Sequence, residues 1–186
     1  MKTKLGRLAD AGLLTLALAG CSVLPKPPPA PARHDFGPTR GSLAALPWSQ
    51  AEVVTPEWLR DSAMHYRLLY ASPTELRSYT RDSWVAPPSE LLANRLNAGQ
   101  RSGTRRVTVT LQNFEQVFDR PGNSSVVMRF HVRADSGGAG TTAAEWDFRF
   151  EMATPTGDAA GALRVYPQLI QKAEAALRAW VIQLPN

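Results

Sequence analysis

Two runs of alternating apolar and polar residues, separated by a glycine-rich stretch, constrain the fold of this chain most strongly. Their apolar positions are Val126, Met128, Phe130 and Val132 in the first run, and Ala144, Trp146, Phe148, Phe150 and Met152 in the second. Alternation of this kind predicts strands with one buried face. Residues 137–140 have the sequence Gly-Gly-Ala-Gly, which predicts a hairpin connection. The chain should therefore contain an antiparallel sheet with one apolar face.

The other faces of these two strands carry opposite charges. The first strand presents Arg129, His131 and Arg133, and the second presents Glu145, Asp147, Arg149 and Glu151. Because opposite charges favour each other across a strand pair, we expect His131 opposite Glu145 and Arg129 opposite Asp147. A solvated sheet face is the simpler interpretation of this ladder, and a subunit interface is the alternative.

Periodicity predicts the other elements as well. A strand is expected over residues 62–70, with Met64, Tyr66, Leu68 and Tyr70 on one face, and another from about Val107 toward Phe118. A short helix should run from about Pro88 to Asn97. These elements predict a single α/β domain of the α+β kind, with a mixed, largely antiparallel sheet and helices packed on it.

A long C-terminal helix should cover the apolar face of the sheet. Its apolar stripe consists of Leu169, Ala173, Ala176, Leu177, Trp180 and Leu184. Proline is tolerated in the first turn of a helix, so this helix begins either near Ala159 or at Pro167, in which case Ala160 to Val165 form a separate turn. A stripe left exposed for a partner or an acyl chain is the alternative to a stripe packed on the sheet.

The N-terminal segment has the features of a bacterial lipoprotein signal. Lys2, Lys4 and Arg7 precede a nine-residue apolar run, Ala11–Ala19, which leads into Gly20-Cys21. This pattern predicts removal of residues 1–20 and lipid attachment at Cys21, the one cysteine of the chain. Ser22 rather than an acidic residue follows, which favours the periplasmic leaflet of the outer membrane. The alternative is an ordinary N-terminal helix with a buried cysteine.

A proline-rich segment follows the predicted anchor. Its prolines are residues 25, 27, 28, 29, 31 and 38. Such a segment favours extended polyproline II and would act as a tether, although plain disorder explains the composition equally well. We therefore expect a signal peptide over residues 1–20, a lipidated cysteine and tether over 21–40, and one folded domain over 41–186.

The composition and motifs give little support to catalysis. Removal of residues 1–20 would lower the net charge from +5 to +3, which is too small to indicate nucleic-acid binding. The sequence contains no nucleophile elbow, zinc-protease motif or phosphate-binding loop. His34, His65 and His131 occur singly. We therefore expect neither an enzyme nor a cofactor or metal site, and a chain that binds rather than reacts.

Several landmarks occur in an order that resembles a known family, the PqiC-type auxiliary lipoproteins of ABC transport systems with an MCE (mammalian cell entry) component. They comprise the segments His34-Asp35-Phe36-Gly37-Pro38, Pro56-Glu57-Trp58-Leu59, Met64-His65-Tyr66-Arg67-Leu68, Tyr79, Ser83-Trp84-Val85-Ala86-Pro87-Pro88, Glu90-Leu91-Leu92, Arg95-Leu96 and Asn113-Phe114-Glu115-Gln116-Val117-Phe118. The resemblance covers nearly all of the chain after the predicted anchor. One departure is Tyr166-Pro167, which follows Gly161-Ala162 where the family often continues an alanine-rich helix.

The resemblance implies a role at the outer-membrane end of a bridge that moves lipids or other hydrophobic molecules between membranes. The implied partners are the membrane, through Cys21, and an MCE-domain protein; a homo-oligomer stays open, and nucleic acid is not expected. The residues expected to serve docking or fold integrity are Trp58, Tyr66, Trp84, Pro87 and Pro88. A structural envelope lipoprotein that supports membrane integrity without transport is the alternative function, and an enzyme is a third.

Overall fold

The computed structural model describes residues 29–38, 45–135 and 143–185. The predicted signal peptide, Cys21 and the glycine-rich connection 137–140 lie outside these residues. The folded unit begins at Pro31, earlier than the predicted start at residue 41. Residues 32–34 form a strand and Phe36 is buried in the core, so the last part of the expected tether belongs to the domain.

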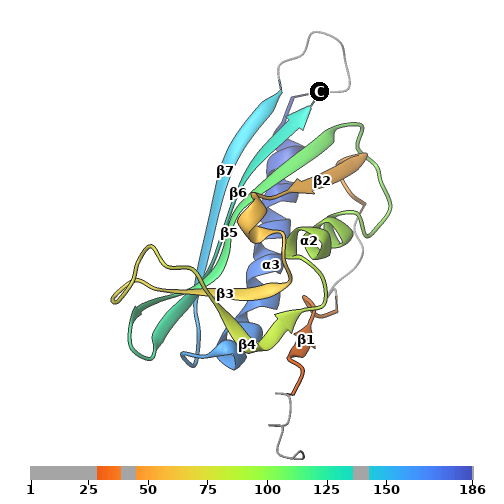
Figure 1. Ribbon diagram of the computed structural model, residues 1–186. Coiled ribbons are helices and arrows are strands. Elements are labelled where there is room, and N and C mark those ends of the chain that lie inside the picture. The colour runs from red at the N-terminus through yellow and green to blue at the C-terminus, as the bar shows by residue number, and fades with distance from the viewer. Residues whose placement is uncertain (1–28, 39–44, 136–142, 186) are drawn as a thin grey trace, which may run out of the picture. The chain divides into compact units, whose positions relative to one another are not determined.

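The centre of the fold is a seven-stranded mixed sheet in the order β1-β4-β3-β5-β6-β7, with β2 paired to β5 (Figure 1). Its strands are β1 (Ala32–His34), β2 (Gln50–Val54), β3 (Ala63–Leu68), β4 (Arg77–Trp84), β5 (Arg106–Arg120), β6 (Asn123–Asp135) and β7 (Ala144–Ala153). The long ladders, β5–β6 and β6–β7, are antiparallel. The strand pairs β1–β4, β2–β5 and β3–β5 are parallel. The sheet is thus mixed and largely antiparallel, as the sequence predicts.

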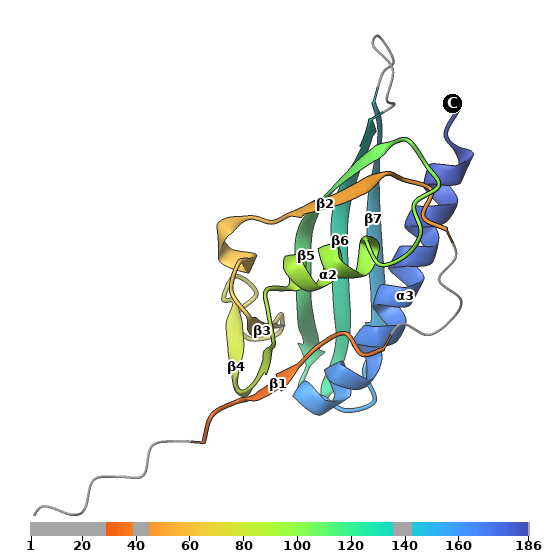
Figure 2. The same ribbon diagram turned by 90° about the vertical axis from the view of Figure 1, so that its right-hand side faces the viewer.

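The helices within the described ranges are η2 (Glu57–Leu59), α2 (Pro88–Leu96) and α3 (Ala159–Gln183). Figure 2 shows α2 and α3 on the same side of the sheet, with α3 running along β6 and β7. The α2 range confirms the prediction of a short helix that starts at Pro88. Among the described residues, no helix combines the length and apolar character needed to cross a bilayer.

α3 begins at Ala159 and continues through Pro167, so a start at Pro167 is wrong. The beginning is fixed by Asp158, whose carboxylate accepts a hydrogen bond of 2.7 Å from the Gly161 backbone N–H. This hydrogen bond is the main reason why the pKa of Asp158 is lowered. Pro167 lacks an N–H, so the Leu163 carbonyl has no helical donor at that position. The helix tolerates this loss because its apolar side is buried.

The apolar face of the β6–β7 hairpin packs against α3, which confirms the predicted cover. On β6, Val126, Met128, Phe130 and Val132 are all buried. On β7, Phe148 contacts Trp180 of α3 with 6.2 Å between ring centroids. Trp146 at the far end of β7 is 57% exposed, so the predicted face is only partly covered there.

The predicted register of this hairpin is wrong by two residues. His131 lies opposite Asp147, Arg133 opposite Glu145, and Arg129 opposite Arg149. A slip of two residues keeps every side chain on its own face, so alternation alone cannot distinguish the two registers. His131 Nδ1 lies 3.2 Å from an Asp147 oxygen, and its Nε2 lies 3.8 Å from Glu145.

Candidate functional site

Four aromatic side chains from distant parts of the sequence meet in the core, and we call them the aromatic junction. They are Phe36 after β1, Trp84 at the end of β4, Phe114 of β5 and Tyr166 of α3, and all four are buried. Trp84 packs edge-on against Phe36 and Tyr166, with centroid distances of 5.4 and 5.1 Å. Phe114 lies 4.7 Å from Tyr166. Burial raises the pKa of Tyr166, so its phenol stays protonated.

The strand before Phe36 is fastened to the sheet by side chains as well as by its ladder. His34 Nε2 lies 2.9 Å from the carboxylate of Asp82 on β4. The His34 carbonyl accepts a hydrogen bond of 2.8 Å from the Val85 N–H, and Arg33 donates to the Val85 carbonyl. These contacts fix where the chain enters the domain.

Arg95 of α2 holds the loop after Phe36 against α3. Its Nη1 donates to the Gly37 carbonyl at 3.0 Å, and its Nε donates to Glu174 of α3 at 2.9 Å. The two charged side chains are 9% and 14% exposed. Desolvation raises the pKa of Glu174, and the Arg95 charge opposes this shift without cancelling it. One guanidinium therefore connects three segments.

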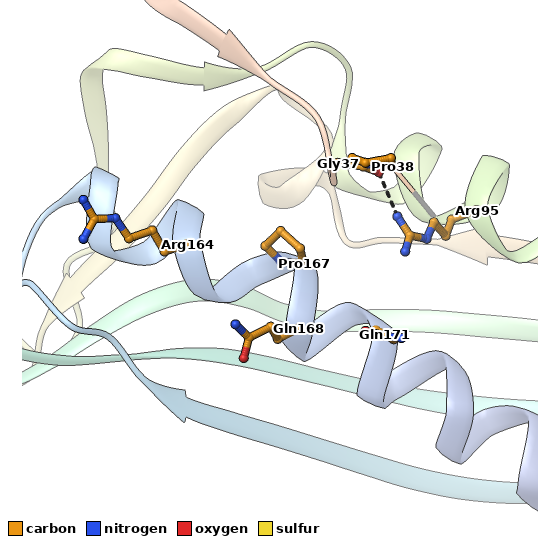
Figure 3. A pocket seen from close by; sticks show the side chains of 7 residues that line it. All are labelled: Gly37, Pro38, Arg95, Arg164, Pro167, Gln168 and Gln171. Atoms are coloured by element: carbon orange, nitrogen blue, oxygen red, sulfur yellow. Dashed lines mark hydrogen bonds between the residues drawn. The ribbon is translucent and has the colours of Figure 1, made fainter. Parts of the chain in front are cut away.

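An open groove of about 150 Å³ lies beside Arg95 and Gly37, and it is the candidate functional site. Figure 3 shows its lining, in which Arg95 and Arg164 lie toward opposite ends and the Pro167 ring stands between them. The complete lining is Gly37, Pro38, Arg95, Arg164, Pro167, Gln168 and Gln171. Gly37 has φ +71°, a conformation that favours glycine, and a side chain there would begin 4.0 Å from the Pro167 ring.

A polar network lies beside Tyr66 and runs from β4 through β5 to β6. Tyr79 donates its hydroxyl to Gln116 at 2.8 Å, and Gln116 donates to the Ser124 hydroxyl at 2.8 Å. Burial raises the pKa of Tyr79, which keeps its phenol a donor. The ring of Tyr66 packs at a tilt against that of Tyr79, with 4.7 Å between ring centroids. This network satisfies buried polar groups, which is a structural task.

The structure separates the residues that the sequence singles out for docking or fold integrity. Trp84 is buried in the aromatic junction, whereas Trp58 of η2 is 42% exposed. Pro87 and Pro88 are the N-cap and first residue of α2. A direct docking contact is therefore open to Trp58 and closed to Trp84.

His34 and His65 each pair with one acid, whereas His131 lies near two, Asp147 and Glu145. His65 lies 3.0 Å from Asp61, and the partners of His34 and His131 are given above. Within the part of the chain that the structure describes, no group of three or more His, Cys, Asp or Glu side chains could hold a metal ion.

Sequence reasoning missed the groove. Arg95 belongs to a landmark of the resemblance, but nothing in the sequence shows that it reaches the loop after Phe36. Arg164, Gln168 and Gln171 are spaced by four and three residues, which places them on one side of a helix, and this spacing was the one available signal.

Comparison with solved structures supports the fold. A protein from Xanthomonas campestris, described with the family model DUF330, has 13% sequence identity and a TM-score of 0.62; the match covers 81% of this chain and 91% of that one. A second structure, described as an uncharacterized protein, has 16% identity and a TM-score of 0.62, with 82% and 99% covered. At such identities the likeness establishes the fold alone.

The chain also has a weaker structural similarity to rare lipoprotein B from Shewanella oneidensis. Here the identity is 10%, the TM-score is 0.29, and the match covers 73% of this chain and 92% of that one. A TM-score this low supports no conclusion about function. No family model and no curated protein matches the chain.

Proposed function

We propose that this chain is a lipid-anchored envelope protein on the periplasmic leaflet of the outer membrane. In this proposal it acts as the auxiliary component of an MCE-type ABC transport system for lipids or other hydrophobic molecules. The observation that carries the proposal is the convergence of three landmark segments at the aromatic junction, through Phe36, Trp84 and Phe114. These segments resemble the family in their order along the chain, and they also contact one another in the folded domain. Such contacts are expected if the segments form a core that the family shares.

The attachment of the N-terminal end of the domain is compatible with a role in docking. Strand β1 follows the proline-rich segment and is fastened to β4 through His34 and Asp82, so a body held by its N-terminal end has a firm point of entry. Energy for transport would come from an ATPase elsewhere in the system. Trp58 is the exposed aromatic landmark, and it is the side chain best placed for contact with an MCE-domain protein.

Photo-crosslinking in cells tests the partner. A photoreactive amino acid replaces Trp58 in the full chain, and the matched control replaces Arg129, which is exposed on β6. We expect an MCE-domain protein to be captured from position 58 and not from position 129. Capture of porins or peptidoglycan alone, from both positions, would support the structural lipoprotein instead.

Metabolic labelling with an alkyne fatty acid tests the anchor separately. The full chain should carry the label and fractionate with the outer membrane, and Cys21→Ala should lose the label. Trp58→Ala serves as the matched control and should keep it. An unlabelled native chain, or label that survives Cys21→Ala, would remove the anchor from the proposal.

A further inference from the structure

The groove beside Arg95 and Arg164 has an excess of hydrogen-bond donors over acceptors. Arg95 presents a side chain that is only 9% exposed and is held in place by Glu174 and the Gly37 carbonyl. These bonds use Nε and Nη1, and Nη2 has no hydrogen-bond partner among the described residues. A guanidinium whose position is fixed loses little freedom when it binds a ligand.

The α3 side of the groove adds three polar side chains without hydrogen-bond partners within the described ranges. Arg164, Gln168 and Gln171 lie on one side of the helix and are exposed. Arg164 lowers the pKa of Asp158 through its charge, yet it donates no hydrogen bond to it. Its guanidinium and the two amides are therefore available to a ligand.

The acids near the groove are already engaged. Glu174 accepts from Arg95, Asp158 accepts from the Gly161 N–H, and Asp35 accepts from the Gly37 N–H at 2.8 Å. A cationic ligand would face two guanidiniums and no free carboxylate in the lining. An anion with several oxygen acceptors matches this set of groups.

The size and layout of the groove favour an ester over a simple ion. An apolar cavity of about 150 Å³ holds a molecule as large as benzene, and this groove has a similar volume. The Pro167 ring separates the two arginines (Figure 3), so a compact ion would meet one of them at a time. An elongated ester can place its phosphate at Arg164, its carbon chain over the ring and a further oxygen at Arg95 Nη2.

We infer that the groove binds a glycerophosphoryl group. Arg164 and Arg95 supply the positive charges that contact it, and Gln168 supplies an amide donor. This ligand chemistry has two sources, a soluble phosphate ester and the headgroup of an anionic phospholipid. The inference does not rest on the proposed function, because a crosslink to an MCE-domain protein would stand whether or not the groove is occupied.

Titration calorimetry on the full chain, purified in a neutral detergent, tests the site with three probes. These are glycerol 3-phosphate, inorganic phosphate, and bilayer nanodiscs of phosphatidylcholine with or without phosphatidylglycerol. We expect glycerol 3-phosphate to bind more tightly than inorganic phosphate. Tighter binding of nanodiscs that contain phosphatidylglycerol would identify the lipid source, and binding of the soluble ester alone would identify the soluble source.

Two variants connect binding to the groove. Arg164→Gln should weaken binding of the tighter probe about tenfold, since a charge-assisted hydrogen bond is lost. Gln168→Glu should abolish it, because a carboxylate in the groove repels the phosphate. Arg129→Gln, an exposed arginine on β6 outside the groove, should bind within twofold of the wild type. Absence of binding by every probe, or binding that Arg164→Gln leaves unchanged, would overturn the inference.

Discussion

Arg95 of α2 and Glu174 of α3 form an ion pair that joins the two helices over the sheet, with 2.9 Å between Nε and Oε1. The pKa of Glu174 is raised because desolvation of its carboxylate outweighs the attraction of the Arg95 charge. The pair therefore adds little net stability to the fold. Its main effect is to fix the relative positions of α2, α3 and the loop at Gly37. Loss of one partner alone should nevertheless be costly.

Arg95→Met should lower the free energy of unfolding by about 3 kcal/mol at pH 8, because Glu174 is left buried without its counter-charge. At pH 5 the loss should be smaller, since Glu174 can then be neutral. Urea unfolding followed by circular dichroism measures both values. Arg129→Met should change stability by less than about 0.5 kcal/mol. An equal loss at the two pH values would contradict this account of the pair.

Glu174→Gln should reveal the titration of this carboxyl in the folded protein. Because its pKa is raised on folding, the folded chain binds the proton more tightly than the unfolded chain does. Its stabilising contribution is thus complete below the ordinary value of 4.5 and declines as the pH rises through the raised value. The free energy of unfolding of the wild type, minus that of Glu174→Gln, should therefore fall from pH 4.5 toward neutral pH. A difference that rises over this range would refute the direction.

Trp84→Ala should destabilise the domain by about 3 to 5 kcal/mol, because it leaves a cavity among buried aromatic rings. Trp58→Ala is the matched control, since this tryptophan is 42% exposed, and it should cost less than about 1 kcal/mol. Thermal unfolding of the two variants side by side compares them. Similar losses would mean that Trp58 is also essential to the core.

Pro167→Ala should stabilise α3 while it impairs the groove. The alanine restores a donor for the Leu163 carbonyl, and the expected gain is about 1 kcal/mol or more, below the roughly 3 kcal/mol that separates proline from alanine inside a helix. Removal of the ring should weaken glycerol 3-phosphate binding about threefold or more. Differential scanning calorimetry and titration measure the two effects on the same sample, and a lower melting temperature would contradict the first.

The elements with strong local periodicity were predictable. Helix α2, helix α3 and strands β5, β6 and β7 each carry an apolar pattern that reports their type without knowledge of their neighbours. Strands β1, β2 and β4 are short or polar, and β1 and β2 pair in parallel with segments far along the chain. Such pairings depend on tertiary contacts, so no local pattern indicates them.

The candidate site was less predictable than the fold. Trp84 was singled out, but its position in the aromatic junction depends on Phe36 and Tyr166, which lie far from it in sequence. The groove depends on Arg95 reaching across to the Gly37 carbonyl, a contact between residues 58 positions apart. Lipid attachment at Cys21 stays a prediction, as does the identity of the partner.

The ladder between β1 and β4 spans three residues, and its length bears on how the domain would respond to force at its N-terminal end. A pull on the chain at Pro31 reaches β1 first, at the edge of the sheet, where a short ladder and the side-chain contacts of Arg33 and His34 resist it. Phe36 lies just behind, buried against the rings of Trp84 and Phe114, and its extraction would require far more force. A force applied at Pro31 would therefore detach β1 from β4 before it disturbs the aromatic junction.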